Sequence, residues 1–357
     1  MGLARVCGNR ALEQRSPMLV TYIRSSSYNN YDYCQQQYYI NYVLGYPSMS
    51  GKKAQQGTIV HKVMECLAAC KKKIQDMPNS GLMSIQDDAL GKITFTKSRL
   101  ASDKFVNELV DQSFEHYISN CVHSYTKGDE KNCRKWTWMG LHYNNGQFDP
   151  RNRDIVDTEP HFDIVIDEPW AEYSHALEDG SELKGRLAIK GTIDLVTKVE
   201  DSVIEVIDWK TGRRINWATG EEKDYNRLES DPQLLLYYYA ISKLYPDYDQ
   251  AIMTVFYIKD GGPFSLCFDD GSKDLFLSML RKRFNEIKNN KSPQLLSPNQ
   301  SHWKCTKLCD YYKTNWEGTD TNVCRYVHNH IKKHGIERTN VECAKPDFNI
   351  GYYDAPG

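Results

Sequence analysis

The sequence contains no long apolar run. Its apolar stretch AIMTVFYI, residues 251–258, is far shorter than the roughly 20 residues that a helix needs to cross a bilayer. Charges are scattered through the first residues, where a signal peptide requires an apolar block, and Val6 stands where a myristoylation pattern requires Ser or Thr. We therefore expect a soluble, cytoplasmic protein without a membrane partner.

The sequence also has little net charge and no regular cysteine pattern. Its formal net charge is −2, so bulk positive charge cannot hold a nucleic acid, although a local patch or a bound metal ion could. The eleven cysteines are odd in number and irregularly spaced, which indicates a reducing compartment and leaves some of them as candidate metal ligands. With 357 residues, 40% of them hydrophobic, the chain can bury one large core or two modest ones.

Hydrophobic periodicity predicts an α/β protein. Helical spacing is found at residues 25–45, 54–75, 98–125, 231–245 and 274–290. Strand patterns are found at residues 161–167, 187–199, 203–209 and 250–258. The helix at 231–245 has a clear start, because Asp231 suits the N-cap and Pro232 the first helical position. The succession of strands and helices favours an α/β core behind a helical N-terminal part, and the stretch after Ser297 shows little periodicity.

Three charged residues interrupt two neighbouring strand patterns. If the turn between the strands is centred on Asp201, antiparallel pairing brings Asp194 opposite Asp208, with Lys210 one step along the same face. Facing carboxylates destabilise a sheet unless something neutralises them, and Mg²⁺ favours one or two carboxylates completed by water and phosphate oxygens. A lysine beside them could hold a nucleophilic water and offset charge on the attacked phosphate. The pattern predicts phosphodiester hydrolysis, with a merely solvated hairpin end as the alternative.

These residues belong to longer motifs. Gly191-x-x-Asp194 and the run Asp208-Trp209-Lys210-Thr211-Gly212 resemble the RecB-like branch of the PD-(D/E)XK nuclease superfamily. The stretches Gly57-x-x-x-His61 and Gln233-x-x-x-Tyr237 and the N-terminal signature at residues 25–45 follow in the family's order. The resemblance extends over residues 25–325. It implies a restriction-endonuclease-like core, with a mixed central sheet flanked by helices, a helical N-terminal insertion and a cysteine-bearing C-terminal segment.

The resemblance also implies roles for individual residues. Asp194, Asp208 and His61 would hold Mg²⁺ or Mn²⁺, Lys210 would orient the attacking water, and the Gln233 and Tyr237 pair would position that water or the DNA. For His61 the alternative is an ordinary residue on a helix surface, and for the Gln233 and Tyr237 pair it is plain packing. Glu159 is a further acidic candidate, which we interpret as a loop carboxylate.

Five segments follow from this reading: an unassigned tail at 1–20, N-terminal helices with Cys34 and the His61 motif at 21–75, a largely helical insertion at 76–158, the nuclease core at 159–295 and the cysteine-bearing segment at 296–357. A start at Met18 stays open, because the first seventeen residues match no motif.

Four cysteines gather at the two ends of the motif order. Cys34, Cys305, Cys309 and Cys324 are similar to the ligands of the iron–sulfur subgroup of this family, which includes AddB-like nuclease subunits and CRISPR adaptation nucleases. The resemblance implies a 4Fe-4S cluster that ties the chain ends together. The fourteen residues between Cys309 and Cys324 depart from the family's tighter spacing. Zinc or no metal therefore stay as alternatives, and Cys343 could replace one ligand.

The sequence thus predicts a metal-dependent DNA nuclease, in particular an exonuclease of recombination, repair or replication that acts on single strands or duplex ends. Because no G-x-x-x-x-G-K-[ST] motif is present, any unwinding would need a helicase or recombination protein as partner. The alternatives are an end-processing nuclease of CRISPR adaptation and a catalytically idle DNA-binding or metal-cluster scaffold. The tyrosines at 237–239 could stack on bases or, as is commoner, fill the core.

Overall fold

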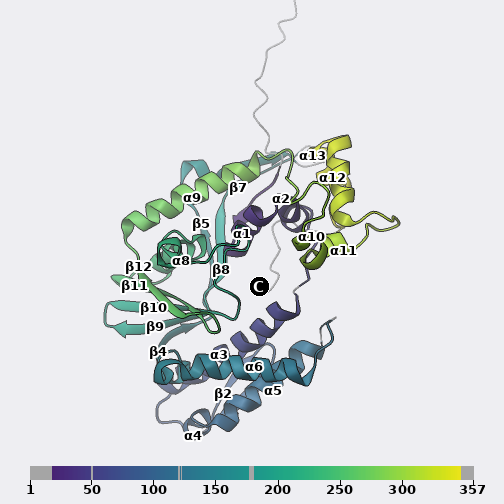
Figure 1. Cartoon of the computed structure of the whole chain (residues 1–357). Helices are drawn as coiled ribbons and strands as arrows, with labels where there is room; N and C mark the ends of the chain where they lie inside the picture. Colours follow the sequence, from purple (N-terminus) through teal and green to yellow (C-terminus); the bar gives the residue numbers. More distant parts are fainter. Residues whose placement is uncertain (1–17, 50, 120, 122, 177–180, 347–357) are drawn as a thin grey trace, which may run out of the picture.

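A five-stranded mixed sheet lies at the centre of the molecule (Figure 1). The structure is a computed structural model and describes residues 18–49, 51–119, 121, 123–176 and 181–346. The strands run in the order β12 (Gly262–Cys267), β11 (Gln250–Tyr257), β10 (Val203–Lys210), β9 (Leu195–Glu200) and β4 (Asp154–Thr158). β10 and β11 are parallel, and the other neighbours are antiparallel. The predicted α/β class with a mixed central sheet is therefore confirmed.

The two faces of β10 contact different cores, because successive side chains of a strand point to opposite sides. Ile204 and Val206 belong to one core, which α8 and α9 cover, whereas Ile207 and Trp209 belong to another, which α3, α5 and α6 cover. Figure 1 shows these two helical layers above and below the sheet. The helices span Pro232–Leu244 (α8), Asp270–Lys288 (α9), Lys52–Asp76 (α3), Asp103–Ser119 (α5) and Lys127–His142 (α6).

Helix α8 makes the crossover between the parallel strands β10 and β11. It starts as predicted: the Asp231 carboxylate accepts the backbone N–H of Gln233 at 2.9 Å, and Pro232 occupies the first turn. The carboxylate satisfies one of the amide groups that a helix start leaves unpaired. The N-terminal turn of α8 is thereby fixed near the carboxyl end of β10.

The strand expected at 187–199 is two strands that belong to different sheets. β8 (Ala188–Thr192) pairs with β1 (Tyr22–Ile23) and β5 (His161–Val165) in a separate three-stranded sheet, and β9 begins only at Leu195. Gly191 allows the ring of Phe162 to cross β8, because a Cβ at this position would lie 2.5 Å from the Phe162 Cζ. The break leaves Asp194 at the junction of the two sheets.

The stretch 76–158 contains strands as well as helices. Besides α4 (Lys97–Leu100), α5 and α6, it forms the hairpin of β2 (Met83–Asp87) and β3 (Gly91–Phe95), and it ends with β4, an edge strand of the central sheet. The periodicity analysis missed the hairpin because each strand has only five residues. A core that begins at 159 would exclude β4. Short elements elsewhere are β6 (Glu172–Ala176), β7 (Glu182–Arg186), η2 (Tyr143–Gly146), η3 (Pro150–Asn152), η4 (Pro169–Ala171) and α7 (Tyr225–Leu228).

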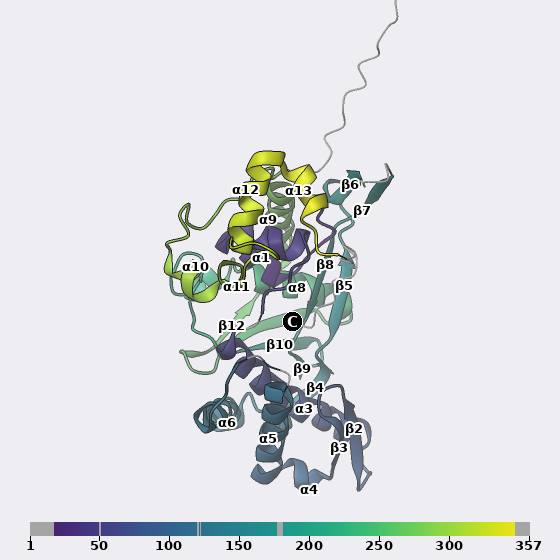
Figure 2. The ribbon, with the colours of Figure 1, turned by 90° about the vertical axis from the view of Figure 1, so that its right-hand side faces the viewer.

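The two ends of the described chain pack together. The expected helix at 25–45 is interrupted at Cys34, whose backbone is extended between α1 (Ser25–Tyr33) and α2 (Gln35–Tyr38), and a π-helical turn (Tyr39–Val43) follows. The C-terminal part is more regular than its weak periodicity suggested. It forms α10 (Trp303–Leu308), α11 (Asp310–Lys313), α12 (Val323–His334) and α13 (Ile336–Glu342). Figure 2 shows these helices beside α1.

No helix among the described residues is long and apolar enough to cross a membrane.

Candidate active site

The β9–β10 hairpin has the register that the sequence predicts near its open end. Leu195 pairs with Ile207 and Val196 with Val206, so the next residues along the same register are Asp194 and Asp208. A bulge between Val203 and Ile204 confines the irregularity to the turn end. The Asp194 carboxylate accepts the backbone N–H of Trp209 at 2.8 Å, which fixes it beside the end of β10.

Asp208 and Lys210 share one face of β10 and meet the helix α8. The Lys210 Nζ lies 2.9 Å from Oδ1 and 2.7 Å from Oδ2 of Asp208. The Gln233 Nε2 also donates to Asp208 Oδ1, at 3.0 Å, and lies 3.1 Å from the Tyr237 hydroxyl. That hydroxyl donates to the Thr192 carbonyl oxygen at 3.0 Å. The i, i+4 spacing places Gln233 and Tyr237 on one face of α8, and four predicted residues therefore form one hydrogen-bonded group.

His61 reaches the same region from helix α3. Its Nδ1 lies 3.4 Å from Asp194 Oδ2, and its ring meets the Trp209 ring edge-on. Gly57, one turn earlier, explains the close approach: a Cβ there would lie 2.6 Å from the Thr211 Oγ1. The motif glycine thus lets α3 pass over the end of β10 and present His61 to Asp194.

The carboxylates differ in electrostatic environment. Burial and the neighbouring charge of Asp194 raise the pKa of Asp208 to about 6, although the Lys210 ammonium opposes them. Burial also raises the pKa of Asp194, but the charges of His61 and Lys210 outweigh it and hold that pKa below its usual value. For His61, burial lowers the pKa, and the Asp194 carboxylate more than compensates and raises it. Pairs of titratable groups with pKa values shifted apart are typical of catalytic centres.

The three predicted metal ligands are not gathered around one point. In the described part of the chain, one group of three or more His, Cys, Asp or Glu residues has all its ligand atoms within 4.8 Å of one another, and it consists of Glu65, Asp87 and Asp88. His61 is instead paired with Asp194, and Asp208 with Lys210. The Asp208 Oδ2 is buried beside the Lys210 ammonium at 2.7 Å, which occupies one of the two lone pairs of this oxygen. Such an oxygen has a lone pair available for a cation.

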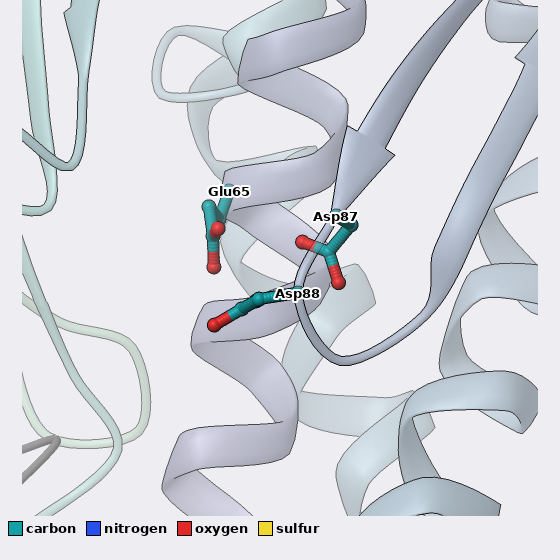
Figure 3. A group of neighbouring side chains, drawn as sticks. All are labelled: Glu65, Asp87 and Asp88. Carbon is teal, nitrogen blue, oxygen red and sulfur yellow. The ribbon is translucent and has the colours of Figure 1, made fainter.

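The Glu65, Asp87 and Asp88 group lies around a lysine. Figure 3 shows Glu65 on a helix, α3, and the two aspartates at the end of a strand, β2, and in the turn after it. The Lys62 Nζ lies 2.6 Å from Glu65, 3.2 Å from Asp87 and 3.0 Å from Asp88. This ammonium lies between the three carboxylates, so a metal ion at this candidate acidic site would have to displace it.

Two carboxylates near His61 were missed or undervalued by sequence analysis. Burial and the charge of Glu159 raise the pKa of Glu65 to about 8, and burial likewise raises the pKa of Glu159. Glu159 has a left-handed backbone (φ 47°), and its N–H donates to the Asp194 carbonyl oxygen at 3.3 Å. It therefore lies in a turn, as interpreted, but in contact with the site. The i, i+4 spacing of His61 and Glu65 on α3 was the available signal for Glu65.

The four candidate cysteines meet at the packed chain ends. Cys34, Cys305, Cys309 and Cys324 line one small apolar pocket as free thiols, and Cys343 is not among the residues that line it. Burial raises the pKa of all four thiols, that of Cys309 to about 11. Within the described residues, no three of these sulfurs lie within 4.8 Å of one another. A single tetrahedral zinc ion, with Zn–S bonds of about 2.3 Å, would require sulfurs about 3.8 Å apart.

Amide groups point at several of these sulfurs. Cys34 and Cys309 occupy the N-caps of α2 and α11, where nearby backbone N–H groups oppose the rise that burial causes in the pKa of both thiols. The buried Nε2 of Gln300 has no oxygen partner and faces Cys324. Its Oε1 is held by the Asn322 amide at 3.1 Å. Hydrogen bonds to sulfur favour thiolates and are typical of metal–sulfur centres.

The sequence was compared with family models and with curated proteins. No curated protein matches it. The family model described as the PD-(D/E)XK nuclease superfamily matches residues 25–314. This range includes the β9–β10 hairpin, α3, α8 and three of the four candidate cysteines, Cys34, Cys305 and Cys309. The chain therefore belongs to the PD-(D/E)XK nuclease superfamily.

Proposed function

We propose that the protein is a Mg²⁺- or Mn²⁺-dependent deoxyribonuclease with its active site at the open end of the β9–β10 hairpin. Membership of the superfamily makes it a nuclease at the coarse level. The observation that carries the specific assignment is the connected group of Asp208, Lys210, Gln233 and Tyr237, beside the His61–Asp194 pair. This group joins acidic ligands, a cation and hydrogen-bond donors in one place.

Asp194, Asp208 and His61 would hold the divalent ion. Carboxylate oxygens suit Mg²⁺ and Mn²⁺, and imidazole is a further ligand for the transition metal. The Oδ2 of Asp208, which keeps one lone pair beside its contact with Lys210, and the deprotonated Asp194 fit this role. When bound, the ion would supply positive charge to the scissile phosphate and lower the pKa of a water molecule.

Lys210 would act on the water and the phosphate. Its Nζ is now paired with Asp208, and the Asp208 and Asp194 charges raise its pKa despite burial, so the group stays an ammonium. Neutralisation of Asp208 by a cation would release Nζ to donate to the attacking water and to a phosphate oxygen. Gln233 and Tyr237, linked at 3.1 Å, would position the attacking water and the phosphate relative to each other.

We further propose an exonuclease that acts on DNA ends in recombination, repair or replication, alongside a helicase or recombination protein. The RecB-like motif order supports this proposal. End processing in CRISPR adaptation is the alternative. The cysteine arrangement fits both functions, because AddB-like nuclease subunits and CRISPR adaptation nucleases share it.

The cysteine pocket would hold a 4Fe-4S cluster. The sulfurs are too widely spaced for one zinc ion, whereas a cluster spreads its four thiolates over a larger volume. The N-cap positions of Cys34 and Cys309 and the orphaned amide of Gln300 fit the negative charge of cluster thiolates. The cluster would hold the N-terminal and C-terminal segments together.

The nuclease proposal is tested with end-labelled single- and double-stranded DNA, incubated with Mg²⁺, Mn²⁺ or chelator. We expect degradation that requires the metal and falls at least about 100-fold in Lys210→Ala. A ladder that shortens from one end would establish exonuclease action. Equal behaviour of wild type and variant, without cleavage under any metal, would instead leave a DNA-binding or scaffold protein.

The cluster proposal is tested on protein purified without oxygen, by visible absorption and by iron and zinc content per chain. Cys324→Ser should lose the iron, and Cys267→Ser, at an exposed cysteine outside the pocket, should keep it. Stoichiometric zinc, or iron retained in Cys324→Ser, would contradict the assignment.

A further inference from the structure

The loop that follows the catalytic strand ends in an exposed tryptophan. In the tip loop, residues 213–223, Ile215 bridges to Glu222, and the Asn216 N–H donates to the Glu221 carbonyl oxygen at 2.8 Å. The loop is therefore an ordered hairpin. Trp217 lies at its tip with 48% of its surface exposed, only seven positions after Lys210.

A buried lysine attaches this tip to the cysteine-bearing segment. Lys304, on α10, donates from Nζ to the carbonyl oxygens of Trp217 and Ala218 and lies 5.1 Å from the centre of the Tyr33 ring. Its neighbour Trp303 is 51% exposed. The two indoles thus come from segments that Lys304 holds together. The His302 ring stacks on the Trp303 ring at a centroid distance of 5.9 Å, and about half of the surface of each tryptophan stays exposed.

These two residues are unusual among the tryptophans of the chain. Of the seven tryptophans, all within the described residues, only Trp217 and Trp303 have 36% or more of their surface exposed. Tyr237, Tyr238 and Tyr239, which the sequence offered for base stacking, are buried in the core. Trp217 and Trp303 are therefore the two indoles whose surface is open to a base.

We propose that Trp217 and Trp303 form a stacking surface for the unpaired bases of single-stranded DNA next to the active site. This inference rests on the proposed nuclease function, because Lys210 fixes where the phosphate would lie. Indole rings accept any base on their faces, and the exposed cations Arg213 and Lys307, on the tip loop and α10, flank them. They would contact the phosphates between the stacked bases. A blunt duplex has its bases stacked inside and gains nothing from this surface.

The test measures DNA binding separately from cleavage. In a common Lys210→Ala background, fluorescence anisotropy follows a labelled 20-nucleotide strand and the matching blunt duplex. We expect Trp217→Ala to bind the single strand about tenfold more weakly, which is the effect of losing one stacked base, and the duplex almost unchanged. Trp217→Phe should recover most of the affinity, and Trp217→Leu should not. Trp303→Ala should behave like Trp217→Ala.

Leu82→Ala is the matched control, since Leu82 is an exposed apolar residue in the bend just before β2. Unchanged single-strand affinity in both tryptophan variants, or an equal loss for strand and duplex, would overturn the proposal and leave the indoles as a protein-docking surface. Cleavage by the wild type is assayed in parallel. If the wild type cleaves DNA and the tryptophan variants bind it normally, the stacking surface alone is rejected. If the wild type does not cleave and the variants bind more weakly, the nuclease function alone is rejected.

Discussion

Two lysine–carboxylate clusters near helix α3 look alike but differ in the number of carboxylates that the lysine contacts. Lys62 is buried and lies within 3.2 Å of three carboxylates, those of Glu65, Asp87 and Asp88. Lys210 contacts one carboxylate, that of Asp208, through both oxygens. Asp194 is left to His61. The Lys62 ammonium lies between all the carboxylates of its cluster, whereas Lys210 contacts Asp208 alone and leaves Asp194 and His61 as further ligands.

The difference shows that proximity of carboxylates does not by itself identify a catalytic metal site. The tightest acidic group of the described residues already contains an ammonium. It joins α3 to the turn of the β2–β3 hairpin, where Asp87 also accepts the N–H groups of Ala89 and Leu90 at 2.9 and 2.7 Å. We infer a structural role for Lys62 and a catalytic role for Lys210.

The largest effect on folding is expected for Lys62→Met. The variant leaves Glu65 and Asp87 in a buried site without their counter-ion, and breaking such a pair costs about 3 kcal/mol or more. Urea denaturation should show this loss in the free energy of unfolding. Cleavage per folded molecule should stay close to wild type.

Addition of Ca²⁺ provides a second test of the Lys62 cluster. In Lys62→Met the three carboxylates face one another without the ammonium, so added Ca²⁺ should restore part of the lost stability, and it should not stabilise the wild type at this site. Lys62→Met combined with Asp87→Asn serves as control, because it removes one charge and should need no calcium. An unchanged unfolding free energy in Lys62→Met would show that the two clusters do not differ as inferred.

A smaller effect is expected from pH, and it concerns the Lys210 cluster. Metal ligands must be deprotonated, and both the raised pKa of His61 and the Asp208 pKa of about 6 keep protons on the site in mildly acidic solution. Cleavage should therefore rise with pH and fall about tenfold for each unit below about pH 6. Higher Mg²⁺ should move the midpoint to lower pH, since the ion competes with protons. Initial rates between pH 5 and 8.5 at two Mg²⁺ concentrations check this, and a midpoint independent of Mg²⁺ would contradict it.

The smallest effect is expected for Asp88→Asn. Its side chain is 88% exposed although it pairs with Lys62, and exposed ion pairs contribute about 1 kcal/mol or less. The Lys62 ammonium lowers the pKa of Asp88, so this small contribution should vanish as the pH falls through that pKa. Urea denaturation at pH 7 and pH 3 measures it. A loss of unfolding free energy as large as that of Lys62→Met would mean that the exposed Asp88 carboxylate provides most of the stabilisation of the cluster.

The sequence alone was enough to predict features that depend on residues close together in the chain. The alternation around Asp201 gave the register that places Asp208 beside Asp194, and the cap at Asp231 gave the start of α8. It was not enough for the hairpin of β2 and β3, nor for the break between β8 and β9. Strands of five residues carry too little periodicity, and the break depends on β8 pairing with the distant strands β1 and β5 instead of continuing into β9.

What the sequence determined by itself is the set of reactive residues and their local spacing, because strand alternation and helical turns fix which neighbours share a face. Only the tertiary structure decided which distant residues meet. It brought His61 to Asp194 across 133 positions of the chain, gathered Cys34 with Cys305, Cys309 and Cys324, and placed Lys304 under Trp217. Such contacts form because whole faces of helices and strands are buried against one another. Many residues contribute to that packing, and the sequence spacing of any one residue does not reveal its partner.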